Sequence, residues 1–363
     1  MAGFSMRPCG DFRTTYRQDT RIFDTTFVRN AAILGVIATA LIPFVLDGYY
    51  VNLFIQISYF AIAALGLNIL VGFTGQISLG HAAFFGFGAF ASAWINNTTG
   101  IPVLLSIPLA GLMTAAVGLL FGLPAARIKG LYLAIATLAA QFILEDFFAR
   151  ADWFTGGSYG AAANPVNVFG YEVLDDFSFF YVCLFFLVIM YLLGTNLMRT
   201  RDGRAFVAVR DHYLSAEIMG INLTKYRLMS FAISSFYAGI GGAMYGHYLG
   251  FVSAEGFTIL LSIQFLGMII IGGLGSVKGT LMGTIFMVLL PEVMENGVGL
   301  LSVFDWANST AVTDGLAYIK EMAIGLAIIL SNRTGSRTAG SRSGRTGSFI
   351  PSRTDQYRRN PVA

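Results

Sequence analysis

Long apolar runs separated by short polar segments make up most of this chain. A helix that crosses a bilayer needs about 20 mostly apolar residues, and many of the runs reach that length. The pattern predicts an all-α polytopic membrane protein with about ten transmembrane helices, and at least eight. The predicted helices cover residues 31–46, 50–71, 80–95, 102–122, 131–148, 178–197, 228–250, 258–274, 280–296 and 316–331.

The composition agrees with a membrane protein and excludes most soluble classes. Charged residues make up 12% of the chain and hydrophobic residues 55%, whereas globular domains carry about 25% charged residues. From Gly48 to Ala126, 79 consecutive residues carry no formal charge. These unbroken runs differ from the short alternating segments of membrane β-barrels, so helices are the predicted form.

The positive charges indicate which side of the membrane each polar segment occupies. With a cytoplasmic N-terminus, the segments on that side hold 21 of the 23 Lys and Arg residues, as the positive-inside rule requires. Both termini are therefore predicted to be cytoplasmic. The expected divisions are a cytoplasmic arm at 1–30, a transmembrane domain at 31–331, which includes an outer loop at 149–177 and a cytoplasmic loop at 198–227, and a basic tail at 332–363.

The cytoplasmic loop is the most polar segment inside the transmembrane domain. It holds six Lys or Arg residues and three acids between two charge-free flanks. Residues 204–220 predict a helix, because they contain good helix formers and no proline, and end on a glycine suited to a C-cap. Projected at 100° per residue, the charges fall on all sides and leave no apolar stripe. We expect this helix to lie between the membrane domain and another protein.

The third predicted span is rich in glycine and carries uncharged polar side chains. The glycines favour close helix packing, and helices broken near the bilayer can also line a substrate path. Polar groups in hydrocarbon need partners or water, so four side chains are candidates for such a path, although a structural role for the histidine is the stronger reading. They are Asn68, Gln76, Ser78 and His81.

A second glycine-rich turn follows 200 residues later. Residues 69–75, ILVGFTG, align with residues 269–275, IIIGGLG, in the same predicted orientation. This suggests a parallel internal repeat, an arrangement known in transporters, and adds Gly272 and Gly275 to the candidate path. The turn lacks the GxxxxGK[ST] order of a phosphate-binding loop, so no nucleotide site is expected in this chain.

Four segments together resemble the inner-membrane permeases of bacterial branched-chain amino acid ABC importers, and more narrowly the LivM-type subunits of the LivHM family. They are GLNILVGFTGQISLGHAAFFGFGAF (66–90), TGGSYG (155–160), AVRDHYLSAEIMGIN (208–222) and IIIGGLGSVKGTLMG (269–283). The chain departs from these permeases after residue 330, where the basic tail replaces an acidic-proline-arginine-glycine turn. From its composition we expect the tail to be disordered and solvated, with contact to anionic membrane lipid as the alternative.

The resemblance implies a multi-pass permease of the bacterial inner membrane that is not itself an enzyme and needs no cofactor. The implied partners are a second, LivH-type permease subunit, two cytoplasmic ATP-binding subunits and a periplasmic or extracellular substrate-binding protein, with no nucleic acid. The resemblance assigns coupling to the ATPase to residues of the 198–227 loop, namely Arg204, Arg210, Asp211, Ala216, Glu217 and Gly220. In the outer loop it marks Thr155, Gly156 and Gly157.

Two alternatives remain open for the function. Urea and short-chain amide importers have similar permeases, and a self-contained small-solute channel also fits an apolar path. Ion-coupled transport is disfavoured because the core of every predicted span lacks an acid. A membrane enzyme or metal site is not expected, because the three histidines are scattered and the two cysteines form no motif.

Overall fold

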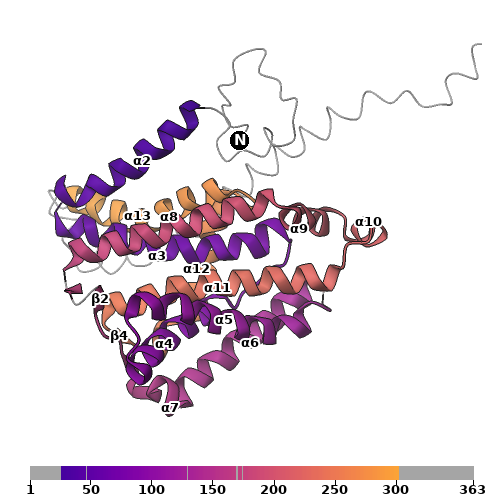
Figure 1. Ribbon diagram of the computed structural model, residues 1–363, viewed down its shortest axis with the longest axis horizontal. Helices are drawn as coiled ribbons and strands as arrows, with labels where there is room; N and C mark the ends of the chain where they lie inside the picture. Colours follow the sequence, from indigo (N-terminus) through magenta and orange to yellow (C-terminus); the bar gives the residue numbers. More distant parts are fainter. Residues whose placement is uncertain (1–25, 46, 129, 169–170, 174, 302–363) are drawn as a thin grey trace, which may run out of the picture. The chain divides into compact units, whose positions relative to one another are not determined.

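A computed structural model describes residues 26–45, 47–128, 130–168, 171–173 and 175–301. The chain divides into two compact units, Met1–Leu289 and Leu290–Ala363; within the second, the described part is the end of helix α13. Nearly all described residues are helical (Figure 1). The helices are α2 (Thr26–Val45), α3 (Gly48–Leu67) continuing as the π-helix η1 (Asn68–Phe73), α4 (His81–Thr99), α5 (Val103–Ala125), α6 (Leu131–Arg150), α7 (Asp152–Thr155), α8 (Asp176–Arg199), α9 (Arg201–Asp211), α10 (Tyr213–Ile218), α11 (Leu223–Leu249), α12 (Ile259–Gly272) and α13 (Val277–Leu301).

The expectation of a helical membrane protein is confirmed in its coarse form. Among the described residues, five helical segments are long and apolar enough to cross a bilayer: Gly48–Phe73, Val103–Ala125, Tyr132–Arg150, Asp176–Arg199 and Ala254–Gly272. The first nine predicted spans coincide with helices. The tenth, at 316–331, lies outside the described residues, as do the tail and most of the N-terminal arm. The total of ten crossings and the side on which each terminus lies remain predictions.

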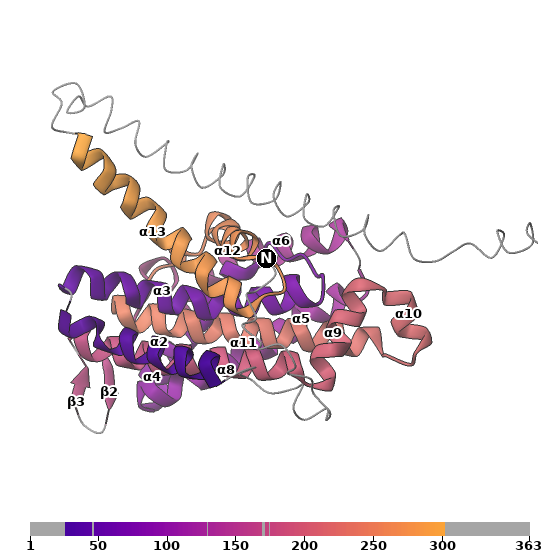
Figure 2. The same cartoon turned by 90° about the horizontal axis from the view of Figure 1, so that it is seen from above.

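Helix α11 forms the centre of the first unit and packs against α3, α4 and α5 (Figure 2). Small residues make this close packing possible. A Cβ atom at Gly242 of α11 would overlap the carbonyl oxygen of Phe85 in α4, and one at Gly88 of α4 would overlap the carbonyl of Gly239. The backbones of α4 and α11 therefore touch directly, with no side chain between them.

Short strands join the loops at one end of α11. β1 (Ala161–Ala162) pairs antiparallel with β4 (Phe251–Val252), and β2 (Val166–Val168) pairs with β3 (Tyr171–Val173). The buried His247 near the end of α11 links this region, since its ring nitrogens lie 2.8 Å from the Ser92 hydroxyl and 2.8 Å from the Asn164 carbonyl. The α9–α10 hairpin lies at the other end of α11 (Figure 1).

Candidate functional site

Two helices, α9 and α10, stand where the sequence predicts one helix over residues 204–220. His212 separates them with backbone angles of φ −148° and ψ 78°. The side chain of Thr200 caps the start of α9 by accepting a hydrogen bond from the Gly203 amide at 3.3 Å. The prediction of one helix without an apolar stripe is therefore wrong, because the projection ran across the break at His212 and mixed the faces of two helices.

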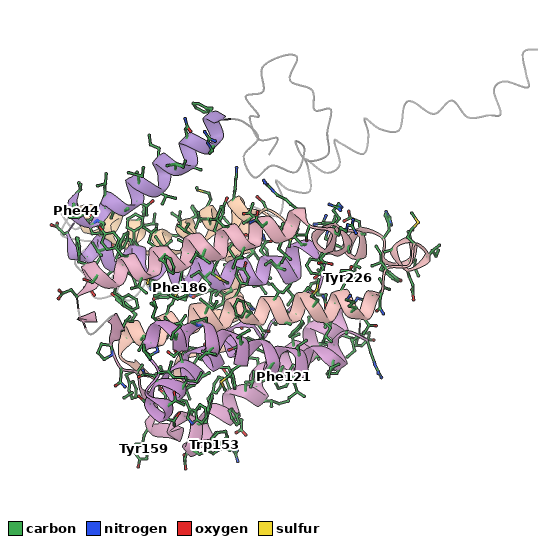
Figure 3. The ribbon with its side chains drawn as sticks, in the orientation of Figure 1. Phe44, Phe121, Trp153, Tyr159, Phe186 and Tyr226 are labelled. Carbon is green, nitrogen blue, oxygen red and sulfur yellow. The ribbon has the colours of Figure 1, made fainter. Side chains whose placement is uncertain are left out.

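Helix α9 packs its apolar side chains inside the protein. Phe206 and Val209 are both buried. The ring of Phe206 meets Tyr226 of α11 edge to face, with centroids 6.0 Å apart. The Tyr226 hydroxyl donates to Asp202 at 3.3 Å; Figure 3 labels Tyr226. These contacts attach the α9–α10 hairpin to the helix at the centre of the bundle.

Helix α10 presents its large apolar side chains to the outside. The exposed fractions are 60% for Leu214, 86% for Ile218 and 84% for Met219. Leu214 and Ile218 are four residues apart and share one helix face, and Met219 follows at the helix end. Contiguous exposed apolar side chains mark contact sites for proteins or membranes. We call these three residues the α10 face.

The residues assigned to ATPase coupling divide between the two sides of the hairpin. Arg204, Asp211 and Glu217 are exposed. Ala216 is buried and supports the turn that ends α10, because its carbonyl accepts from the Ile221 amide at 3.0 Å. Gly220 ends α10 with φ +85°, a conformation that favours glycine.

Three of the candidate path residues meet where two glycine-rich turns touch. The turns are residues 72–75, which begin in the last two residues of η1, and 272–276, which begin at the last residue of α12; we call them the paired glycine turns. A Cβ atom at Gly72 would overlap the amide nitrogen of Gly275. The Asn68 side chain accepts from the Gly275 amide at 2.9 Å and donates to the Ser276 carbonyl at 3.2 Å. Asn68 and Gly275 thus hold the turns together, whereas a Cβ atom at Gly272 would overlap the carbonyl oxygen of Gly279 in α13. Arg210 of α9 donates to the Gly72 carbonyl at 2.6 Å.

Gln76 and Ser78 lie in the extended segment that leads from the first turn to α4. Gln76 donates to the Ser230 hydroxyl at 2.7 Å and to the Arg227 carbonyl at 3.3 Å, both on α11. The Gln76 Oε1 and Ser78 Oγ atoms are buried and have no hydrogen-bond partner among the described residues. Buried polar atoms of this kind require a partner, and water or a solute can provide one.

His81 makes a structural contact. Side chains close to it form a cap on the start of α4 that the sequence analysis did not predict. Its Nε2 atom lies 2.8 Å from the Ala63 carbonyl of α3. The amides that begin α4 are satisfied by side chains of α6 and α12. Thr137 accepts from Leu79 at 3.0 Å, Gln141 from Ala83 at 2.9 Å and Ser262 from Ala82 at 2.9 Å. The signal in the sequence was the four-residue spacing of Thr137 and Gln141, which places both on one face of an apolar helix.

The outer-loop candidates form a compact turn after α6. Thr155 is fully buried, and its hydroxyl lies 2.7 Å from the Phe148 carbonyl, to which it donates, while it accepts from the Gly157 amide at 3.1 Å. Gly156 and Gly157 have φ of +71° and +60°. The arrangement holds the aromatic side chains of Trp153 and Tyr159 outward, with 72% and 91% of their surfaces exposed (Figure 3).

Comparison with known proteins places these features in a family. Residues 49–330 match the family described as branched-chain amino acid transport system, permease component. The high-affinity branched-chain amino acid transport permease LivM of Salmonella typhimurium is 32% identical over 287 residues, which cover 72% of this chain and 67% of the relative. LivM of Escherichia coli K12 is 31% identical over 70% of this chain and 65% of the relative. A probable LivM of Methanocaldococcus jannaschii is 28% identical over 64% and 78%.

The matched segment spans about two thirds of each enterobacterial relative. No solved structure matches the chain. The family match covers most of the chain, from the start of α3 to beyond α13, and it includes both the α9–α10 hairpin and the paired glycine turns. The chain therefore belongs to the family of branched-chain amino acid transport system permeases.

Proposed function

We propose that this chain is the transmembrane permease subunit of an ABC importer for branched-chain, hydrophobic amino acids, and that the α10 face docks on a cytoplasmic ATP-binding subunit. The observation that carries the docking is the exposure of Leu214, Ile218 and Met219 at one end of the bundle. The exposed acids Asp211 and Glu217 lie close to these side chains along the chain, as expected for the polar rim of a protein contact with an apolar centre. The coupling residues around it fix the shape of the hairpin.

The proposed substrate follows from the relatives, whose names specify branched-chain amino acids. The proposed path passes the unsatisfied polar atoms of Gln76, Ser78 and Ser234, which are buried and lack a partner among the described residues. A path with few polar groups and apolar walls suits an aliphatic amino acid delivered by a binding protein. Urea or a short-chain amide is the alternative substrate class, and a self-contained channel is the alternative of a different kind.

The docking is tested by purifying the detergent-solubilised protein from native membranes and identifying the chains that accompany it. The wild type should retain ATP-binding subunits, a second permease and a binding protein. Ile218→Asp combined with Met219→Asp should lower the recovery of ATP-binding subunits at least tenfold, because it places charge in the apolar centre of the contact. Tyr159→Asp, at an equally exposed position in the outer loop, is the matched control and should retain them.

The outcome decides between the classes of function. A wild-type protein that purifies without any ATP-binding subunit would contradict the importer and favour the channel. For the substrate, uptake of labelled leucine by the reconstituted complex should be inhibited by isoleucine and valine. Inhibition by urea or acetamide instead would favour the amide importers.

We also propose a multi-pass arrangement in the bacterial plasma membrane with the α9–α10 hairpin in the cytoplasm. In right-side-out vesicles, a cysteine at Tyr159 should react with an impermeant maleimide, and a cysteine at Ile218 should react only after the vesicles are opened. Both positions are more than four-fifths exposed, so access depends on the side of the membrane alone. Both cysteine variants are made in a protein that also carries Cys9→Ser and Cys183→Ala, so that the native cysteines do not react. Labelling of Ile218→Cys in sealed vesicles would contradict the topology.

A further inference from the structure

Arg210 is the residue that joins the α9–α10 hairpin to the paired glycine turns. It lies near the end of α9, three residues before α10 begins. Its guanidinium points back toward the transmembrane helices, where Nη1 donates to the Gly72 carbonyl at 2.6 Å. Its Nε atom donates to Asp211 at 2.9 Å, which fixes the orientation of the guanidinium. Arg210 therefore contacts the permease itself through its guanidinium, while 35% of its side-chain surface remains exposed.

Both glycine turns are shaped to receive this side chain. A Cβ atom at Gly75 would lie 3.0 Å from Cγ of Arg210, and one at Gly275 would lie 3.0 Å from its Nη1. Both glycines have positive φ, +71° and +78°, so each turn bends sharply beneath the arginine. The stem of Arg210 thus covers one turn and its guanidinium covers the other.

The two turns end the two helices that lead toward the proposed path. Residues 72–75 include the end of η1 and lead through Gln76 to the start of α4, whereas residues 272–276 begin at the last residue of α12. Asn68 binds the backbone of the second turn through both ends of its amide. A displacement of Arg210 therefore acts on both helix ends at once, because the turns are already fastened to each other.

We propose that Arg210 is a positioning residue that transmits movement of the docked α9–α10 hairpin to the paired glycine turns, and so to α4 and α12. The inference rests on the proposed function. The guanidinium suits this role because it is planar and always charged, and its donors are held in a fixed geometry. It donates to a carbonyl at the C-terminal end of η1, where the helix dipole favours a cation. The hydrogen bond between Arg210 and Gly72 stays formed throughout the transport cycle. Arg210 thus acts as a strut, by which we mean a rigid link between α9 and the paired glycine turns.

The test measures how much substrate moves for each ATP hydrolysed. The permease is reconstituted with its co-purified subunits and binding protein, and leucine uptake and ATP hydrolysis are followed together. Arg210→Ala should leave recovery of the ATP-binding subunits unchanged, since the α10 face is intact, and should lower leucine transported per ATP at least tenfold. Arg201→Ala, an exposed arginine at the start of the same helix, is the matched control and should keep the wild-type ratio.

A purely structural role for Arg210 would lower the amount of complex and both rates in parallel. An unchanged ratio of leucine to ATP in Arg210→Ala would therefore overturn the inference. It would leave the proposed function intact, because that proposal fails only if the wild type carries no ATP-binding subunit.

A cysteine pair provides a second measurement. The Cβ position at Gly75 lies 3.6 Å from Cβ of Arg210, a separation that a disulfide spans. Gly75→Cys with Arg210→Cys, in a chain carrying Cys9→Ser and Cys183→Ala, should form the disulfide on mild oxidation, with loss of two electrons and two protons to the added oxidant. If transport requires a rigid link between α9 and the paired glycine turns, the oxidised protein should transport several times more leucine per ATP than the reduced protein.

Gly75→Cys alone is the control for strain at a position with positive φ. Oxidation should leave the amount of leucine that this variant transports per ATP unchanged. A disulfide that forms without raising the amount of leucine transported per ATP hydrolysed would contradict the role of Arg210 as a strut. Failure of the disulfide to form would show that the two backbones are not in contact.

Discussion

Replacing Gly242 by alanine is expected to remove most of the folded protein. The added Cβ would overlap the carbonyl oxygen of Phe85 and would lie 2.7 Å from its carbonyl carbon. Neither atom can move without shifting α4 as a whole, because both belong to the backbone. Overpacking of a tight core usually costs about 1–3 kcal/mol, and a collision between two backbones lies at or above the upper end of that range.

The measurement is the thermal midpoint of the purified protein in detergent, together with its yield from membranes. Gly35→Ala is the matched control, because a Cβ atom at Gly35 in α2 meets nothing within 4 Å. Alanine is favoured over glycine in a helix by about 1 kcal/mol, so the control should be as stable as the wild type or slightly more so. A Gly242→Ala protein with the wild-type midpoint would show that α4 and α11 are not in backbone contact.

Replacing Gln141 by methionine is expected to cost about 2–4 kcal/mol of stability, because several buried groups lose their partner together. Gln141 accepts from the Ala83 amide at 2.9 Å and from the Ser262 hydroxyl at 3.2 Å, and it donates to the Phe257 carbonyl at 2.7 Å. Methionine has a similar length and no strong hydrogen-bonding atom. The amide at the start of α4 would then remain buried and unpaired.

Gln264→Met on α12 is the control for the loss of a glutamine as such, since Gln264 is half-buried. Its thermal midpoint in detergent should stay within a few degrees of the wild type, whereas that of Gln141→Met should fall clearly. A midpoint for Gln141→Met equal to that of the control would contradict the role of Gln141 as a cap for α4.

The helices of the first unit were largely predictable, because a long uninterrupted run of apolar residues is a strong local signal for a membrane-spanning helix. The run at residues 178–197 became α8, and the run at 102–122 became α5, with ends shifted by a few residues. The error at residues 204–220 has a local cause. Nothing in the composition around His212 indicates a break in the helix. The α10 face is recognised only when residues 213–218 are projected as a separate helix, which places Leu214 and Ile218 on one side.

The candidate site was predictable as a set of residues but not as a set of contacts. Polar groups in an apolar run must find partners, which singled out Asn68 and Gln76 from the sequence alone. Their partners lie 208 and 154 residues away along the chain, in Ser276 and Ser230, and no local pattern specifies such pairs. Arg210 was expected to take part in coupling to the ATPase, and its side chain also donates a hydrogen bond to the Gly72 carbonyl, 138 residues away along the chain. Its role in coupling remains a prediction.

The side-chain cap on α4 has a consequence for how the protein is made. Neither α4 nor α11 is among the segments apolar enough to cross a bilayer by composition alone, although both lie at the centre of the bundle. The start of α4 is completed by Gln141 and by Ser262, which leave the ribosome about 60 and 180 residues after it. During synthesis the first amides of α4 therefore lack these two partners until the later helices have been made. Mutations in α6 or α12 that weaken the cap should then appear first as degradation of the nascent chain.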